Sequence, residues 1–167
     1  MIGPNHVLTA AHCMGYDFEI VVGEHQIKSA EDGTRHEVCG TTSHPQYNSG
    51  TTDYDYAIVR LKEPVQLGAR AMPACLADAT MTDAALDGQT GTVSGWGSTA
   101  SGADQAEVLM SVDVPMMSNA ACRQTGYGNN EITDAMLCAG QPNGGVDSCQ
   151  GDSGGKELHH SNFYSIE

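Results

Sequence analysis

The stretch Asp147-Ser-Cys-Gln-Gly-Asp-Ser153-Gly-Gly155 places a serine among glycines in a segment with almost no apolar residues. Glycine adopts backbone conformations that other residues avoid, and its missing side chain lets a substrate approach the main chain. The backbone N–H groups of Gly151 and Ser153 can therefore face an oxyanion that develops beside the serine. The stretch predicts a sharp turn that presents Ser153 as a nucleophile.

A serine hydroxyl is a weak nucleophile until a general base takes its proton, and that base needs a carboxylate to orient it. The chain offers both groups. His12 follows the short apolar run at residues 7–8, and Asp55 stands just before the apolar run at residues 57–61. Burying a carboxylate is costly unless it accepts hydrogen bonds, for example from an imidazole N–H. The pattern indicates a histidine–aspartate pair that serves Ser153.

The order of His12, Asp55 and Ser153 along the chain is the order found in the chymotrypsin class of serine proteases. Four further segments match landmarks of that family in family order: His44-Pro-Gln-Tyr-Asn48, Ser94-Gly-Trp-Gly97, Val114-Pro115 and Met136-Leu-Cys-Ala-Gly140. Residues 4–155 resemble a trypsin-like serine protease of the chymotrypsin family. The resemblance implies that His12 is the general base, Asp55 its orienting partner and Ser153 the nucleophile. Asp53 is the rival carboxylate, but the segment at Asp55 matches the family better.

The resemblance also implies a specificity pocket and an activation carboxylate. Asp147 matches the family position at the base of the primary specificity pocket, and Ser148 suits the same pocket. An anion at the floor of a narrow pocket selects a cationic side chain, so the resemblance implies cleavage after Arg or Lys. Asp152 matches the carboxylate that pairs, in active family members, with a new N-terminal amine released by zymogen cleavage.

The expected fold is all-β, with two six-stranded antiparallel β-barrels of the chymotrypsin type, each missing strands in this chain. Apolar or alternating runs predict strands at 19–22, 57–61, 91–94 and 108–114. Ser118 is expected to cap a short helix that runs to Gln124. The expected divisions of the chain are a partial N-terminal barrel at 1–62, a linker at 63–86, a partial C-terminal barrel at 87–155 and a tail outside the family at 156–167.

The resemblance implies that both ends of the family domain are absent. A much longer segment precedes the catalytic histidine in the family than precedes His12 here, and residues 156–167 do not follow the family pattern. Without the activation N-terminus, Asp152 lacks its amine partner. We therefore expect a truncated form that has little protease activity when expressed alone and that exposes apolar surface and unpaired strand edges.

Six cysteines without a C-x-x-C pair or a zinc framework indicate an oxidising compartment and a secreted, extracellular protein. The resemblance implies that Cys122 pairs with Cys138, near the substrate pocket. It also implies that Cys13 and Cys149 are free thiols, because their usual partners lie in the absent ends. Two further cysteines have no partner that the sequence assigns: Cys39 and Cys75.

The chain carries 7 basic and 21 acidic residues, which gives a net charge of −14 at pH 7. This charge argues against nucleic acid and anionic membrane surfaces as partners, and no segment could span a membrane. The partners that the resemblance implies are polypeptide substrates and protein protease inhibitors, and the expected state is a monomer.

The segment from Glu24 to Glu37 resembles the calcium loop of trypsins, with Glu24 and Glu31 at a spacing that suits hard oxygen ligands. Its later acidic ligand is out of register. Two interpretations of this segment remain, a calcium site and a solvated acidic loop. No other cofactor is expected, and no H-E-x-x-H pattern supports a metalloprotease.

Two functions from different classes remain. The first is a serine-type endopeptidase that hydrolyses peptide bonds after Arg or Lys through an acyl-enzyme. The second is a non-catalytic protease homologue that acts as a binding or regulatory module. The presence of His12, Asp55, Ser153 and Asp147 favours the endopeptidase, because a binding role would require none of them.

Overall fold

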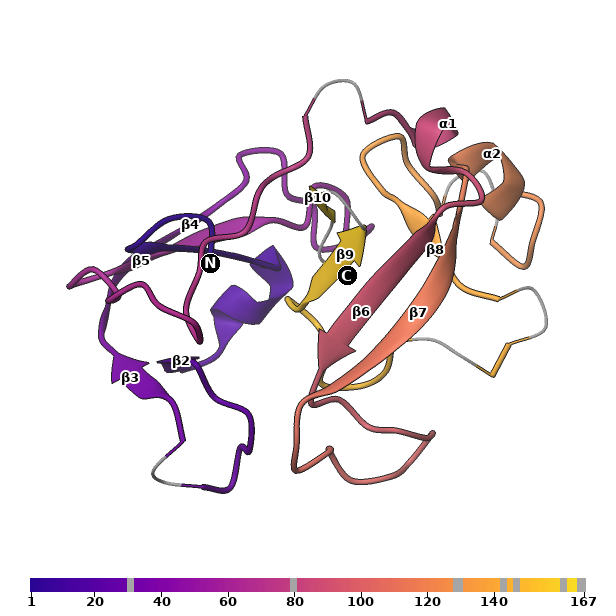
Figure 1. The fold of residues 1–167 in the computed structure, drawn as a ribbon. Helices are drawn as coiled ribbons and strands as arrows, with labels where there is room; N and C mark the ends of the chain where they lie inside the picture. Colours follow the sequence, from indigo (N-terminus) through magenta and orange to yellow (C-terminus); the bar gives the residue numbers. More distant parts are fainter. Residues whose placement is uncertain are drawn as a thin grey trace.

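The structure is a computed structural model that describes residues 1–29, 32–78, 81–127, 131–141, 144–145, 148–159 and 162–164. Strands predominate, and two lobes lie side by side (Figure 1). The first lobe holds strands β1 to β5, and the second holds β6 to β10 together with the two α-helices. Every paired strand is antiparallel, so the all-β prediction is confirmed. No sheet closes into a barrel within these residues, as expected for barrels that lack strands.

The first lobe contains two sheets and a short 3-10 helix. One sheet has the order β1-β5-β4, with β1 at His6–Thr9, β5 at Ala57–Leu61 and β4 at Val38–Ser43. The other pairs β2, at Ile20–Val22, with β3, at Thr34–His36, and the helix η1 occupies Ala11–Gly15.

The central strand β5 supplies most of the first core. Alternate residues of a strand point to opposite faces, and here Ala57, Val59 and Leu61 are buried while Arg60 is exposed. Val59 and Leu61 pack with Val65 in one buried cluster. Full burial of such a side chain stabilises the fold by roughly 1.5–3 kcal/mol, so the predicted strand at 57–61 forms at those residues.

The second lobe is built on one sheet of order β10-β9-β6-β7-β8. Its strands and helices are β6 (Thr90–Gly95), β7 (Met110–Met117), β8 (Cys138–Ala139), β9 (Lys156–His159), β10 (Asn162–Tyr164), α1 (Asp83–Leu86) and α2 (Asn119–Cys122). Leu86 of α1 and Met116 of β7 form its buried cluster. Leu86 therefore packs α1 against the antiparallel pair β6–β7, which we call the main hairpin.

Both α-helices are single turns that begin at a hydroxyl cap. Ser118 Oγ accepts from Ala121 N at 3.4 Å, and Thr82 Oγ1 accepts from Ala85 N at 3.3 Å. The cap at Ser118 was predicted, but α2 ends at Cys122 and hydrogen-bonded turns continue to Thr125. The helix α1 was not predicted, and it forms inside the stretch that the sequence assigned to the linker.

The segment that the sequence placed outside the family contributes two strands to the second lobe. Lys156–His159 form β9, which pairs with β6 on the side that β7 leaves open, and β10 pairs with β9. An open strand edge presents unpaired backbone N–H and C=O groups, which an adjacent extended segment can satisfy whatever its side chains. The side-chain pattern of the segment therefore did not reveal its place in the sheet.

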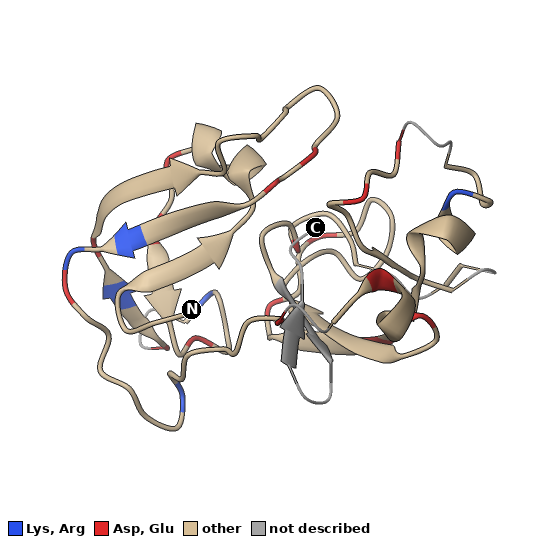
Figure 2. Ribbon diagram, turned by 90° about the horizontal axis from the view of Figure 1, so that it is seen from above, with Lys and Arg blue, Asp and Glu red and all other residues tan. Residues whose placement is uncertain are grey.

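The negative charge is carried by both lobes. Figure 2 shows acidic positions on each lobe, whereas the basic positions gather mainly on the first. Within the part of the chain that the structure describes, none of the helices is long and apolar enough to cross a membrane.

Candidate active site

The pairing of β1 with β5 brings His12 and Asp55 together. Thr9, the last residue of β1, pairs with Ala57, the first residue of β5. The residues just after β1 and just before β5 therefore meet at the same end of the sheet. His12 lies on η1, which follows β1, and Asp55 ends the loop that enters β5.

Both carboxylate oxygens of Asp55 accept hydrogen bonds from His12. Oδ1 accepts from the backbone N–H at 2.8 Å, and Oδ2 accepts from ring Nδ1 at 2.6 Å. The Asp55 side chain is 12% exposed and that of His12 is 35% exposed. A carboxylate only accepts, so Nδ1 carries the proton, and Nε2 of the neutral ring is left with a free lone pair. This arrangement holds the imidazole ready to act as a base.

The turn that carries Ser153 packs against the segment that carries His12. The carbonyl oxygen of Ser153 lies 3.9 Å from Cys13 Sγ. Gly154, with φ of +76°, lies so close to Thr9 Oγ1 that a Cβ there would collide with it. Ser153 is exposed, and its hydroxyl donates no hydrogen bond to a described residue, as is common in unliganded active sites. The structure therefore places all three predicted catalytic residues in one region.

The two predicted oxyanion-hole amides lie on the exposed turn that carries Ser153. Gly151 and Ser153 are exposed, and neither backbone N–H donates to another of the described residues. Gly151 has φ of +99°, in the left-handed region that favours glycine. A Cβ at Gly151 would also meet the side chain of Gln105. The backbone conformation therefore favours glycine at this position.

Asp152 is held by backbone amides. Its Oδ1 accepts from Gly97 N at 2.8 Å and its Oδ2 accepts from Cys149 N at 3.0 Å. A Cβ at either Gly95 or Gly97 would collide with the carboxylate. The resemblance implied that this carboxylate pairs with an amine in active family members and lacks that partner in this chain. The structure shows that the missing side chains of the glycines in the 94–97 segment leave the space that the carboxylate occupies.

Ser148 lines a cavity of about 410 Å³ between the main hairpin of the second lobe and the serine turn. Cys149 and Asp152 line the same cavity, together with apolar side chains that include Val93 of β6 and Val112 of β7. Asp147, the predicted base of the specificity pocket, lies outside the described residues, as does Glu31 of the predicted calcium loop.

Asp32, which the sequence pattern did not single out, holds together the loop in which a calcium site was considered. Its Oδ2 accepts from His25 N at 2.6 Å and from Gln26 N at 2.7 Å, and its Oδ1 pairs with the Arg70 guanidinium. The described residues contain no group of three His, Cys, Asp or Glu side chains that could hold a metal ion. The dipeptide Asp32-Gly33, a common turn signal, could have identified this residue.

These contacts predict an acid-sensitive contribution of Asp32 to stability. Hydrogen bonds from Gln26 N and His25 N, followed by the pairing with Arg70, lower the pKa of Asp32 from 3.8 to about 2. A carboxyl whose folded pKa is depressed stabilises the fold above its unfolded pKa, and that contribution is lost as the pH falls through the folded pKa. Asp32→Asn should therefore lower the free energy of unfolding at pH 6, and its difference from the parent chain should shrink between about pH 4 and pH 2.

Urea unfolding at pH 6, 4 and 2 measures this difference. Glu37→Gln is the matched control, because the Glu37–Lys62 pair, 2.7 Å apart, joins two exposed side chains and the Glu37 carboxylate accepts from no backbone amide of a described residue. Such a pair contributes little. If the difference in free energy of unfolding between Asp32→Asn and the parent chain stays the same from pH 6 to pH 2, the stabilising role of the Asp32 carboxylate is contradicted.

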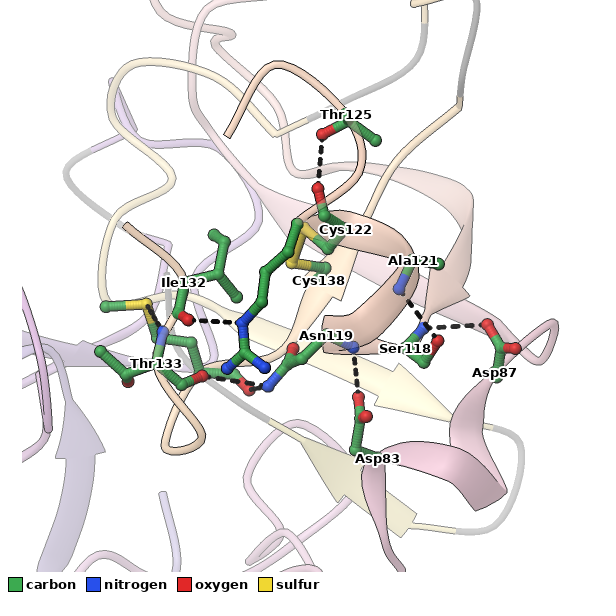
Figure 3. The surroundings of a disulfide bond; sticks show 12 residues. Asp83, Asp87, Ser118, Asn119, Ala121, Cys122, Thr125, Ile132, Thr133 and Cys138 are labelled. Carbon is green, nitrogen blue, oxygen red and sulfur yellow. Dashed lines mark hydrogen bonds between the residues drawn. A yellow bond between two sulfur atoms is a disulfide. The ribbon is translucent and has the colours of Figure 1, made fainter. Parts of the chain in front are cut away.

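A disulfide joins Cys122, at the end of α2, to Cys138 in β8 (Figure 3). Four cysteines are free thiols, as expected for two of them: Cys13, Cys39, Cys75 and Cys149. Burial, with a smaller effect of the Asp55 charge, raises the pKa of the Cys13 thiol. The thiol beside the serine turn is therefore kept in its neutral form.

Comparison with known proteins identifies the family. The sequence model of the trypsin family matches residues 1–165, which include most of the segment that the sequence analysis placed outside the family. The chain is 38% identical to Trypsin-10 of Gadus morhua over 93% of the chain and 62% of that protein. It is 38% identical to Serine protease 1 of Rattus norvegicus over 99% of the chain and 66% of that protein.

A bacterial relative is equally similar. The chain is 39% identical to Trypsin of Saccharopolyspora erythraea over 99% of the chain and 71% of that protein. The chain thus spans about two thirds of the length of these relatives. The chain belongs to the trypsin family of serine proteases.

Proposed function

We propose that the protein to which this chain belongs is a serine endopeptidase that works through an acyl-enzyme. One observation carries the proposal: Asp55 binds His12 through both carboxylate oxygens, while the Ser153 turn packs on the segment that carries His12. A histidine fixed in one tautomer beside an exposed serine is the arrangement that activates a hydroxyl. The trypsins and serine proteases among its relatives support the same reaction class.

Each residue has defined tasks in this mechanism. Ser153 Oγ attacks the carbonyl carbon of the scissile peptide while its proton passes to His12 Nε2. Asp55 stabilises the resulting imidazolium, and the N–H groups of Gly151 and Ser153 bind the oxyanion. His12 then gives the proton to the leaving amine, which leaves an acyl group on Ser153. A water molecule, deprotonated by His12, repeats the sequence and releases the acid.

The substrate class follows from Asp147, which the resemblance places at the base of the specificity pocket. We propose cleavage after Arg or Lys, because a fixed anion in a narrow pocket favours a cationic side chain. We further propose a secreted, monomeric enzyme that meets polypeptide substrates and protein inhibitors outside the cell. The acyl-enzyme route requires no cofactor. In the loop considered for calcium, the Asp32 carboxylate already accepts hydrogen bonds from two backbone amides.

Active-site labelling tests the proposal. Because the chain spans 62% of Trypsin-10, the activity is proposed for the whole protein, and the test uses two forms. One is this chain, and the other, the extended form, is this chain joined at both ends to trypsin-family segments. A fluorophosphonate probe is expected to label Ser153 in the extended form, which should hydrolyse Arg and Lys esters far faster than Phe or Leu esters.

Two variants of the extended form complete the experiment. Ser153→Ala should abolish labelling, and Asp147→Ser should remove the preference for cationic substrates while leaving labelling in place. A folded extended form that takes no label would instead identify a non-catalytic homologue that binds its partners. A preference for aromatic substrates would overturn the specificity.

A further inference from the structure

The segment that leads into Asp55 is conformationally strained. Thr52 and Tyr54 have φ of 55° and 52°, in the left-handed region that residues with a side chain seldom adopt. Such a conformation is energetically unfavourable and persists only where the surroundings fix it. Asp53 lies between them, and its carbonyl accepts from Asn48 N at 3.0 Å. Further contacts must therefore hold this segment in place.

Those contacts come from the other lobe. Asp53 Oδ1 accepts from Thr133 Oγ1 at 2.6 Å, and the Tyr56 hydroxyl donates to the carbonyl of Ala135 at 2.8 Å. Asp53 precedes Asp55 by two positions and Tyr56 follows it by one. The aspartate that orients His12 is thus bracketed by two hydrogen bonds to residues 133–135 of the second lobe.

The second-lobe segment that provides these partners is itself fixed. Asn119, only 5% exposed, donates from Nδ2 to the carbonyls of Thr133 at 3.0 Å and Met136 at 2.8 Å. Arg123 Nε donates to the Ile132 carbonyl at 2.9 Å. Figure 3 shows Asn119 reaching toward Thr133 beside the disulfide of Cys122. The two hydrogen bonds therefore attach the residues on either side of Asp55 to a segment that is itself hydrogen-bonded to α2 and its C-cap.

The first-lobe side of the contact is also ordered. The His44 ring stacks on Tyr54, with ring centres 4.8 Å apart, and meets Tyr56 edge-on at 5.7 Å. His44 N donates to the Tyr56 carbonyl at 2.8 Å. Burial, with the charge of Asp53 next, raises the pKa of Tyr56. Its hydroxyl therefore keeps the proton that it donates across the lobe boundary.

We propose that Asp53, Tyr56 and Thr133 are positioning residues, through which the second lobe sets the place of Asp55 and thereby the orientation of His12. The kinetic part of this inference rests on the proposed endopeptidase function. The structural part does not, because it concerns the hydrogen bond between Asp55 and His12 in this chain.

Two conservative variants test the inference from opposite lobes. Thr133→Val removes the hydroxyl that binds Asp53, and Tyr56→Phe removes the hydroxyl that binds Ala135 but keeps the ring against His44. In this chain, proton NMR of the His12 Nδ1–H follows the Asp55 hydrogen bond directly. Each variant is expected to shift this resonance and to speed its exchange with water at least tenfold. In the extended form, kcat should fall about tenfold to a hundredfold, and KM should be nearly unchanged. The pH dependence of kcat should also shift.

The controls separate positioning from general stability. Thr133→Ser retains the hydroxyl and should restore both readouts. Tyr54→Phe removes a hydroxyl from the same loop that makes no hydrogen bond to a described residue, and it should change neither. If Tyr56→Phe does not fold, Thr133→Val and Thr133→Ser still decide the question. An unchanged His12 resonance in Thr133→Val would overturn the inference.

The two proposals fail in distinguishable ways. If the extended form is inactive but the His12 resonance responds to Thr133→Val, the positioning role stands and the endopeptidase function is wrong. If the extended form is active and Thr133→Val leaves kcat, the pH profile and the resonance unchanged, the positioning role is wrong and the endopeptidase function stands.

Discussion

Replacing Asp55 with asparagine is expected to lower kcat of the extended form about 10⁴-fold, the loss that is typical when the aspartate of a serine-protease triad becomes an amide. The geometry of this chain explains why the loss should be large. Asp55 accepts two hydrogen bonds from His12, one from the backbone N–H and one from ring Nδ1. An asparagine has one acceptor and one donor group in place of two acceptors.

The backbone N–H decides which way the asparagine must face. It always donates, so the amide oxygen must occupy the place of Oδ1, 2.8 Å from His12 N. The amide NH₂ then faces ring Nδ1, which can accept its hydrogen bond only without a proton. The proton of neutral imidazole moves to Nε2, and Nε2 loses the lone pair that would accept a proton from Ser153. The variant folds normally but holds the wrong tautomer.

Two measurements check this prediction. Ester hydrolysis by the extended form gives the loss in kcat, and nitrogen NMR of His12 in this chain reports the tautomer independently of activity. Asp113→Asn is the matched control, because Asp113 is an exposed carboxylate of β7 that accepts a hydrogen bond from Thr92 and lies on the main hairpin of the second lobe. A His12 ring in the Asp55→Asn chain that keeps its proton on Nδ1 would contradict the argument.

The parts of the fold that could be predicted from sequence are those that depend on local patterns. The run at 57–61 alternates in burial as a strand should, and Ser118 caps α2 because its hydroxyl reaches a free N–H of the first turn. The proximity of His12 and Asp55 follows from their places at the end of β1 and the start of β5. Placing Ser153 beside them required the family resemblance, because no local pattern specifies how the lobes pack.

The features that the sequence did not reveal depend on contacts between distant segments. Asp53 was considered only as a rival for the role of Asp55, and its bond to Thr133 spans 80 positions of sequence. The sequence does not distinguish Asp32 from the other acidic residues, because only the folded loop brings two backbone amides to its carboxylate. β9 joins the sheet through backbone groups, which every residue carries, so its side chains gave no sign of it. Such contacts are set by tertiary packing and not by periodicity.

Gly97→Ala is expected to damage both the stability and the activity that depend on the serine turn. A Cβ at this position would collide with the Asp152 carboxylate. The carboxylate cannot swing away without losing its bonds from Gly97 N and Cys149 N. The backbone at residue 97 cannot easily retreat either, because Trp96 Nε1 donates to the His25 carbonyl at 3.0 Å and Ser98 N donates to the Gln150 carbonyl at 2.9 Å.

The clash is therefore relieved by displacing the turn at residues 149–153, which carries the oxyanion-hole amides. Overpacking of this kind costs about 1–3 kcal/mol of stability, and the loss of one aligned oxyanion donor costs about 10²- to 10³-fold in kcat. Urea unfolding and the rate of fluorophosphonate labelling measure the two effects. Gly126→Ala is the control, since a Cβ built there lies more than 4 Å from every described residue other than its chain neighbours. If Gly97→Ala matches this control in both measurements, the carboxylate of Asp152 does not hold the serine turn in place.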